Sequence, residues 1–317
     1  MQVAAKKIIV LGTGGTIAGT AAQAGDNVGY RAGERPVQAL LAGLGGQALP
    51  PGLELAAEQV AQIDSKDADF AFWLALHARC AAHLADDAVR GIVITHGTDT
   101  LEETAWFLAS TLPAGKPVVL TCAMRPATAL SPDGPQNLCD ALALANDLRA
   151  PGVSVVSAGA VYLPQQVQKL HPYRADAIGS GEGGPAGWME EGRLRLAHPW
   201  PSQGAAAAPW RLPEPGAAWP WVEIVLSHAG SSGAQVDALV RAGVDGLVVA
   251  GTGNGTLHQA LEPALRRAQQ AGVAVRVTSR CAFGRIVGTP AHGLPLAEGL
   301  APVKARIALL LELLQRP

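Results

Sequence analysis

The fold is decided first by residues 8–19, IIVLGTGGTIAG, in which four consecutive apolar residues lead into a glycine-rich turn. An uninterrupted apolar run indicates a strand that is buried on both faces, as in a parallel sheet. Similar runs follow at residues 91–95, 117–121 and 153–157, and helical patterns lie between them at residues 66–84, 100–112 and 134–149. This alternation predicts an α/β domain with a doubly wound, mainly parallel sheet.

Polar residues stand directly before these three helical patterns and are the expected N-caps. Asp64 or Ser65 precedes the first helix, Thr98 or Asp99 the second, and residues 131–133 the third. A side-chain oxygen at this position accepts a hydrogen bond from a free backbone N–H group, which is worth about 1 kcal/mol. Capping is therefore one interpretation of Thr98 and Asp99.

The second half of the chain has its own α/β pattern. Gly, Pro, Ala and Trp predominate between residues 179 and 220, although residues 187–196 resemble two strands around a Glu191-Gly192 turn. Strands are then expected at 222–226, 246–250 and 273–278, and helices at 235–242, 257–271 and 303–314. We predict a larger N-terminal domain at residues 1–203, a Pro-rich linker at 204–220 and a smaller C-terminal α/β domain at 221–317.

Composition excludes several classes of protein. The chain of 317 residues is 49% hydrophobic and carries 24 Lys and Arg against 26 Asp and Glu, which argues for a folded core and against a nucleic-acid partner. Its four cysteines form no CxxC pair and no zinc spacing, so we expect neither a metal nor a disulfide network. No run of about 18 apolar residues could span a membrane, and the first apolar run is too short for a signal peptide. We expect a soluble, cytoplasmic protein with a small-molecule ligand.

The glycine-rich turn after the first strand has two explanations. It fails the dinucleotide fingerprint G-x-G-x-x-G, because Ile17 stands where the third glycine belongs, and it lacks the Gly-Lys-Ser/Thr of a P-loop. It could be simply a tight strand-to-helix turn. Alternatively, the hydroxyl of Thr16 could attack a substrate while the surrounding amides stabilise an oxyanion.

Two further segments follow strands, where ligands of such sheets gather. The first is ITHGTDTLEE at residues 94–103, whose His96 has no second metal ligand at helical spacing and is more typical of a packed or backbone-bonded histidine. The second is AMRPATALSPDGP at residues 123–135, which is typical of a rigid, turn-rich loop.

Together these segments are similar to one known family. GTGGTIAG (12–19), ITHGTDTLEET (94–104), AMRPATALSPDGPQNL (123–138) and GTGNGTL (251–257) resemble the bacterial L-asparaginase/glutaminase family over nearly the whole chain. The resemblance implies a cytoplasmic amidohydrolase of asparagine catabolism, which converts L-asparagine and water to L-aspartate and ammonia. It implies a threonine acyl-enzyme, no metal or cofactor, and possible activity on glutamine.

The resemblance also assigns catalytic residues. Thr16 on the GGTI motif is the implied nucleophile, and Tyr30 in GYRAG (29–33) is the implied proton acceptor or shuttle that activates it. Thr98, Asp99 and Lys169 form the implied second set, in which the lysine relays a proton through Thr98. Asp99 would also receive the α-ammonium group of the substrate.

Further positions of the resemblance concern substrate binding and assembly. Ser65, followed by Lys66 where the family commonly has Gln or Glu, would face the substrate α-carboxylate. Lys66 could attract that carboxylate or point to solvent. Asn254 matches a residue donated by a neighbouring subunit, which implies an intimate homodimer, usually within a homotetramer.

One departure from the family lies near the C-terminus. An acidic residue that supports the tyrosine is expected shortly after TSR (278–280), yet no carboxylate occurs before Glu298. A catalytically inactive amino-acid-binding or regulatory homologue is therefore the alternative function.

Overall fold

The computed structural model describes residues 6–45, 53–201, 210–297 and 299–316, which fall into two compact units. Unit 1 spans Met1–Pro209 and unit 2 spans Trp210–Pro317. Residues 202–209 of the expected linker region lie outside the described residues, and residues 210–220 contain neither helix nor strand. Among the described residues, no helix combines the length and apolar character that crossing a membrane requires.

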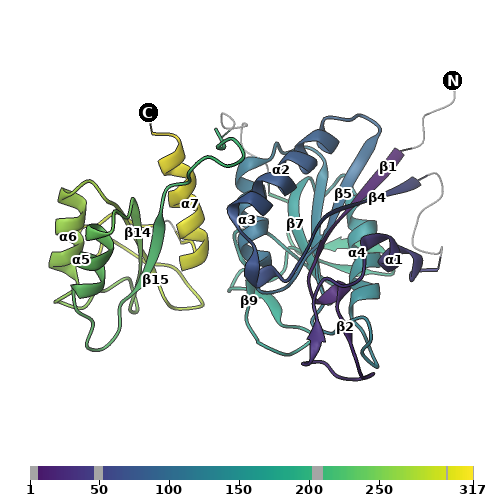
Figure 1. Ribbon diagram of the computed structural model, residues 1–317, viewed down its shortest axis with the longest axis horizontal. Coiled ribbons are helices and arrows are strands. Elements are labelled where there is room, and N and C mark those ends of the chain that lie inside the picture. Colours follow the sequence, from purple (N-terminus) through teal and green to yellow (C-terminus); the bar gives the residue numbers. More distant parts are fainter. Residues whose placement is uncertain (1–5, 46–52, 202–209, 298, 317) are drawn as a thin grey trace. The chain divides into compact units, whose positions relative to one another are not determined.

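Unit 1 is built on an eight-stranded sheet (Figure 1). In spatial order its strands are β12 (Arg193–Leu196), β11 (Gly187–Glu190), β8 (Ala160–Tyr162), β7 (Gly152–Ser157), β6 (Pro117–Thr121), β5 (Val89–Thr95), β1 (Lys6–Gly14) and β4 (Leu53–Ile63). The five strands from β7 to β4 pair in parallel, and β8, β11 and β12 continue the sheet in antiparallel pairing. The expected strands and the 187–196 hairpin are confirmed. Strand β4 was not predicted, because an edge strand that is only partly buried lacks a continuous apolar run.

Helices cover both faces of this sheet, as Figure 1 shows. On one face α4 (Gly134–Ala145) and α1 (Val37–Ala42) pack over the side chains of Ile8 and Val10. On the other face lie α2 (Phe70–Leu84) and α3 (Leu101–Thr111), whose Trp73 and Phe107 rings stack with centroids 4.9 Å apart. The doubly wound prediction is confirmed.

The predicted N-caps of these helices need correction. Helix α2 begins after Asp69, whose carboxylate accepts from Phe72 N, while Asp64 caps only a short 3-10 turn, η2 (Ser65–Asp67). Helix α3 begins after Thr100 and has no side-chain cap. Capping is thus the wrong explanation of Thr98 and Asp99, which leaves their side chains available for other partners.

Unit 2 is a smaller α/β layer structure. Its parallel sheet has the order β13 (Val222–Leu226), β14 (Gly246–Gly251) and β15 (Ala274–Ser279). Helices α5 (Ala234–Arg241) and α6 (Glu262–Gln270) share one apolar core with these strands, and α7 (Pro302–Leu314) packs against the sheet as well. Helix α6 begins five residues later than predicted, because Pro263 has no backbone N–H to donate and is accommodated in the first turn of a helix but not in its interior.

Two small hairpins complete the parts of unit 1 that position the site. Strand β2 (Thr20–Ala21) pairs with β3 (Tyr30–Arg31), and β9 (Val167–Lys169) pairs with β10 (Ile178–Ser180), both antiparallel. Each hairpin carries one candidate residue, Tyr30 on β3 and Lys169 on β9.

Candidate active site

Three neighbouring parallel strands deliver the candidate residues to one edge of the sheet. Ser65 follows β4, Thr16 follows β1 and Thr98 follows β5, and β1 pairs with both of the other strands. Their carboxyl ends therefore lie side by side, which is where ligands of such sheets bind.

Glycines allow the loops after these strands to touch. A Cβ atom on Gly15 would lie 2.3 Å from Gly97 Cα, and one on Gly97 would lie 2.5 Å from Ser65 Oγ. Gly15 also has a φ of 76°, a backbone conformation that glycine adopts readily and residues with a Cβ rarely adopt. The loops that carry Thr16 and Thr98 are consequently in direct backbone contact.

Thr16 opens a single 3-10 turn, η1 (Thr16–Ala18), directly after this contact. Its side chain is buried, and its Oγ1 lies 2.7 Å from the Tyr30 Oη. The tyrosine comes from the β2–β3 hairpin and passes so close to Gly19 that a Cβ there would meet the ring at 2.8 Å. The structure thus brings the expected nucleophile and its expected activating residue within hydrogen-bonding distance.

The second expected set is also assembled. Lys169 Nζ donates hydrogen bonds to Thr98 Oγ1 at 2.8 Å and to Asp99 Oδ1 at 2.5 Å. The lysine side chain is only 19% exposed, whereas the Asp99 side chain is 49% exposed. Thr98 is buried beside them. Asp99 therefore offers solvent and ligands one open face while Lys169 balances its charge.

Ser65 is part of the same loop contact, whereas Lys66 is not. The Ser65 Oγ accepts from Asp99 N at 3.1 Å, and the Ser65 carbonyl accepts from Thr100 Oγ1 at 2.8 Å. Lys66 instead donates to Asp67 at the surface, and this hydrogen bond raises the pKa of the lysine. Of the two possibilities for Lys66, the structure favours the solvent-exposed one.

Asn254 belongs to unit 2, where both ends of its side-chain amide are held by one residue. Its Nδ2 donates to the Val287 carbonyl at 2.8 Å, and its Oδ1 accepts from Val287 N at 2.7 Å. The exposed turn that carries Asn254 is therefore fixed to the loop that follows β15.

His96 is a buried, neutral support for the loop of Thr98. Trp73 Nε1 donates to Thr104 Oγ1 at 3.0 Å, so the threonine proton is free to be donated to His96 Nε2, also at 3.0 Å. The remaining ring proton, on Nδ1, is then donated to the Gly97 carbonyl at 2.7 Å. Burial lowers the pKa of His96 to about 4. The prediction of a packed, backbone-bonded histidine is confirmed.

The two ends of the loop at residues 123–135 are joined by an acidic side chain. The Asp133 carboxylate accepts from the backbone N–H groups of Met124 and Arg125, at 2.9 and 3.0 Å, and so does not cap α4.

Within the described ranges, no group of three or more His, Cys, Asp and Glu residues is arranged to hold a metal ion.

Comparison with known proteins identifies the family. A model of the asparaginase N-terminal domain matches residues 7–202, and a model of the glutaminase/asparaginase C-terminal domain matches residues 221–316. The chain belongs to the asparaginase family. The resemblance seen in the sequence motifs is confirmed.

Members of the asparaginase family resemble the chain over nearly its full length. It is 36% identical to L-asparaginase 2 of Escherichia coli (strain K12), covering 97% of this chain and 89% of that protein. It is also 36% identical to the glutaminase-asparaginase of Pseudomonas fluorescens biotype A, over 95% and 84% of the two chains. The crystal structure of a probable cytoplasmic L-asparaginase from Campylobacter jejuni superposes with a TM-score of 0.89 at 35% identity, covering 98% of this chain and 96% of that one.

Proposed function

We propose that this asparaginase-family protein hydrolyses the side-chain amide of L-asparagine to L-aspartate and ammonia, with some activity on L-glutamine. One observation carries the proposal above the others. Two buried threonine hydroxyls on touching loops each have a proton-transferring partner, Tyr30 for Thr16 and Lys169 for Thr98. Because both hydroxyls have their partners, we do not propose the inactive alternative.

The proposed first half-reaction transfers the acyl group to Thr16. Its Oγ1 attacks the amide carbonyl carbon and gives its proton to the Tyr30 Oη, while Tyr30 releases its own hydroxyl proton toward the substrate. The proton then passes to the amide nitrogen, the C–N bond breaks, and ammonia leaves an ester on Thr16. Positioned proton transfer of this kind typically contributes about 10²–10⁴-fold to a rate.

The proposed second half-reaction uses water. Lys169 and Thr98 relay a proton so that water attacks the ester carbonyl, which releases aspartate and returns the proton to Thr16 Oγ1. The side chains required for both steps are supplied by the chain, and the proposed mechanism uses no metal or cofactor.

The α-ammonium and α-carboxylate groups of the substrate are assigned to Asp99 and Ser65. The half-exposed Asp99 carboxylate receives the α-ammonium group, and Lys169 keeps that carboxylate charged. The Ser65 hydroxyl already accepts from Asp99 N, so its own proton is free for the α-carboxylate. Lys66 lies at the surface with Asp67 and contributes at most long-range attraction.

Assembly and location are part of the same proposal. We assign Asn254 to the site of a neighbouring subunit, in a homotetramer built from intimate dimers, because its fixed, exposed turn presents it outward from unit 2. Light scattering gives the subunit number, and an Asn254→Ala variant that assembles normally but loses substrate affinity supports the assignment.

A cytoplasmic location is supported by the four free cysteines and tested by cell fractionation.

The decisive experiment removes the proposed nucleophile. Thr16→Ala should release no ammonia from L-asparagine, yet it should keep the thermal midpoint and L-aspartate binding of the wild type. Thr111→Ala is the matched control, since the Thr111 hydroxyl donates to the Phe107 carbonyl within α3 and the substitution leaves the backbone contacts in place. Assays with L-asparagine, L-glutamine and D-asparagine define the substrate. Normal turnover by Thr16→Ala would disprove the proposal.

A further inference from the structure

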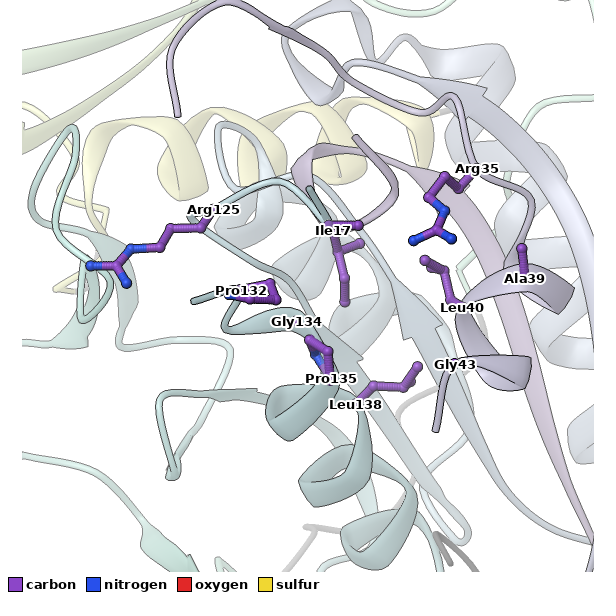
Figure 2. Close-up of a pocket in the computed structure, with 11 residues that line it drawn as sticks. Ile17, Arg35, Ala39, Leu40, Gly43, Arg125, Pro132, Gly134, Pro135 and Leu138 are labelled. Atoms are coloured by element: carbon purple, nitrogen blue, oxygen red, sulfur yellow. The ribbon is translucent and has the colours of Figure 1, made fainter. Parts of the chain in front are cut away.

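A cavity lies beside the turn that carries Thr16. It has a volume of about 170 Å³, and Ile17, Leu40, Pro135 and Leu138 form its apolar wall. Figure 2 shows Ile17 on one side and Leu40 of α1 on the other, with Leu138 of α4 below them. An engineered apolar cavity of about 150 Å³ is known to hold benzene, so this one has room for a group of about six carbon atoms.

One cationic side chain is aimed into this cavity. Figure 2 shows the Arg35 guanidinium above Leu40, directed at the space between Leu40 and Ile17. Glu34, its neighbour in the sequence, is engaged by Thr20 and Arg31 instead. The described part of the chain provides no carboxylate within ion-pair distance of Arg35, and the residues that line the cavity include no acidic side chain.

The other arginine at the cavity is turned away from it. Arg125 Nη1 donates to the Ser131 carbonyl at 3.1 Å, and in Figure 2 its guanidinium points away from Ile17. The site is therefore apolar along its walls, with one positive charge at its rim. That combination suits an anion with a compact apolar body.

The cavity is separate from the proposed reaction site. Neither Thr16 nor Tyr30 lines it, and the residue nearest to the proposed nucleophile in sequence that does so is the buried Ile17. Ile17 is also fixed from the α4 side, since a Cβ on Gly134 would approach its Cγ1 to 2.9 Å. A ligand can thus enter without displacing the residues that touch the substrate.

We propose that this cavity is a second ligand site, which binds a small carboxylate carrying a compact apolar group of about six carbon atoms. The apolar group fills the space between Ile17, Leu40 and Leu138, and the carboxylate pairs with Arg35. The proposal stands on the cavity and its charge and is independent of the catalytic roles given above.

Binding of benzoate by calorimetry tests the proposal on the full chain. The protein is first saturated with L-aspartate, so that the reaction site is occupied. We expect one benzoate per chain with a dissociation constant in the millimolar range, as suits so small a ligand. Benzamide, which has the same shape without the charge, should bind about tenfold more weakly or worse.

Variants locate the site. Arg35→Met should weaken benzoate binding about tenfold, and Ala39→Phe, which places a ring in the cavity, should abolish it. Arg193→Met, which removes an exposed arginine from β12, is the control and should bind normally. Equal affinity of Arg35→Met and wild type would overturn the proposal. So would displacement of benzoate by L-aspartate, a benzoate-induced rise in KM at constant kcat, or the absence of binding.

Discussion

The contact between the loops that follow β4 and β5 predicts that a single methyl group will impair turnover. In Gly97→Ala the new Cβ would lie 2.5 Å from Ser65 Oγ, whereas real contacts of this kind are essentially never closer than 3.0 Å. The Ser65 Cβ would also lie only 2.7 Å away, so rotation of the hydroxyl cannot relieve the overlap, and the two loops must separate by a few tenths of an ångström or more. The backbone at Gly97 does not have a positive φ, so the effect comes from the contact alone.

The size of the effect follows from this displacement. A misplacement of about 1 Å can cost about 10²-fold in rate, so we expect kcat to fall roughly tenfold to a hundredfold. Overpacking of this kind typically costs about 1–3 kcal/mol of unfolding free energy, and each kcal/mol lowers Tm by about 2–4 °C in a chain of this size. Ammonia release gives kcat and KM, and circular dichroism gives Tm.

Gly115→Ala is the matched control, because a Cβ at that position meets no atom within 4 Å. It should have the wild-type kcat. If Gly97→Ala is folded and its kcat equals that of Gly115→Ala, the close approach of the loops has no catalytic importance and the reasoning is wrong.

Three further predictions address single side chains. Lys169→Met should lower kcat about 10²–10⁴-fold with little change in Tm. The control Lys116→Met loses hydrogen bonds to the Leu84 and Asp86 carbonyls, so it should lower Tm and leave kcat unchanged. A Lys169→Met variant with a lowered Tm and an unchanged kcat would remove Lys169 from the mechanism. Tyr30→Phe should lower kcat by a similar factor at nearly constant KM, and an unchanged kcat would show that another group activates Thr16. For His96, burial lowers the folded-state pKa to about 4, from 6.5 in the unfolded chain. The unfolded state binds the proton more readily, so the free energy of unfolding is intact above pH 6.5 and falls by about 3 kcal/mol as the pH drops to 4. Urea unfolding should therefore show a flatter dependence of this free energy on pH in His96→Gln than in the wild type. An equal dependence in the two proteins would contradict the prediction.

Much of the architecture follows from local patterns in the chain. The apolar run of β6 predicted its bounds, Pro117–Thr121, because a strand buried on both faces needs apolar residues at every position. Strand β4 gave no such signal, since it lies at the sheet edge. The start of α2 was not predictable either, because Asp64 and Asp69 are both suitable N-cap residues. Only the structure shows that a 3-10 turn follows Asp64 and that the helix begins after Asp69.

The candidate residues of the site, and the pairing of each threonine with its partner, were predictable from the family resemblance, but the distances that join them were not. The motifs around Thr16 and Thr98 identified the family, and the family implied Tyr30 and Lys169. The cavity beside Arg35 had no sequence signal at all, because its walls come from three separate elements.

By itself, then, the sequence determined the two α/β units, the family and the two candidate threonines, Thr16 and Thr98. These depend only on hydrophobic periodicity and on short motifs. Only the tertiary structure showed that the Thr98 hydroxyl accepts a hydrogen bond from Lys169, 71 positions away, and does not cap the helix that follows it. The physical reason is the order of the strands. Placing β1 between β4 and β5 sets three carboxyl ends side by side, and the glycines at 15 and 97 let the loops after them touch.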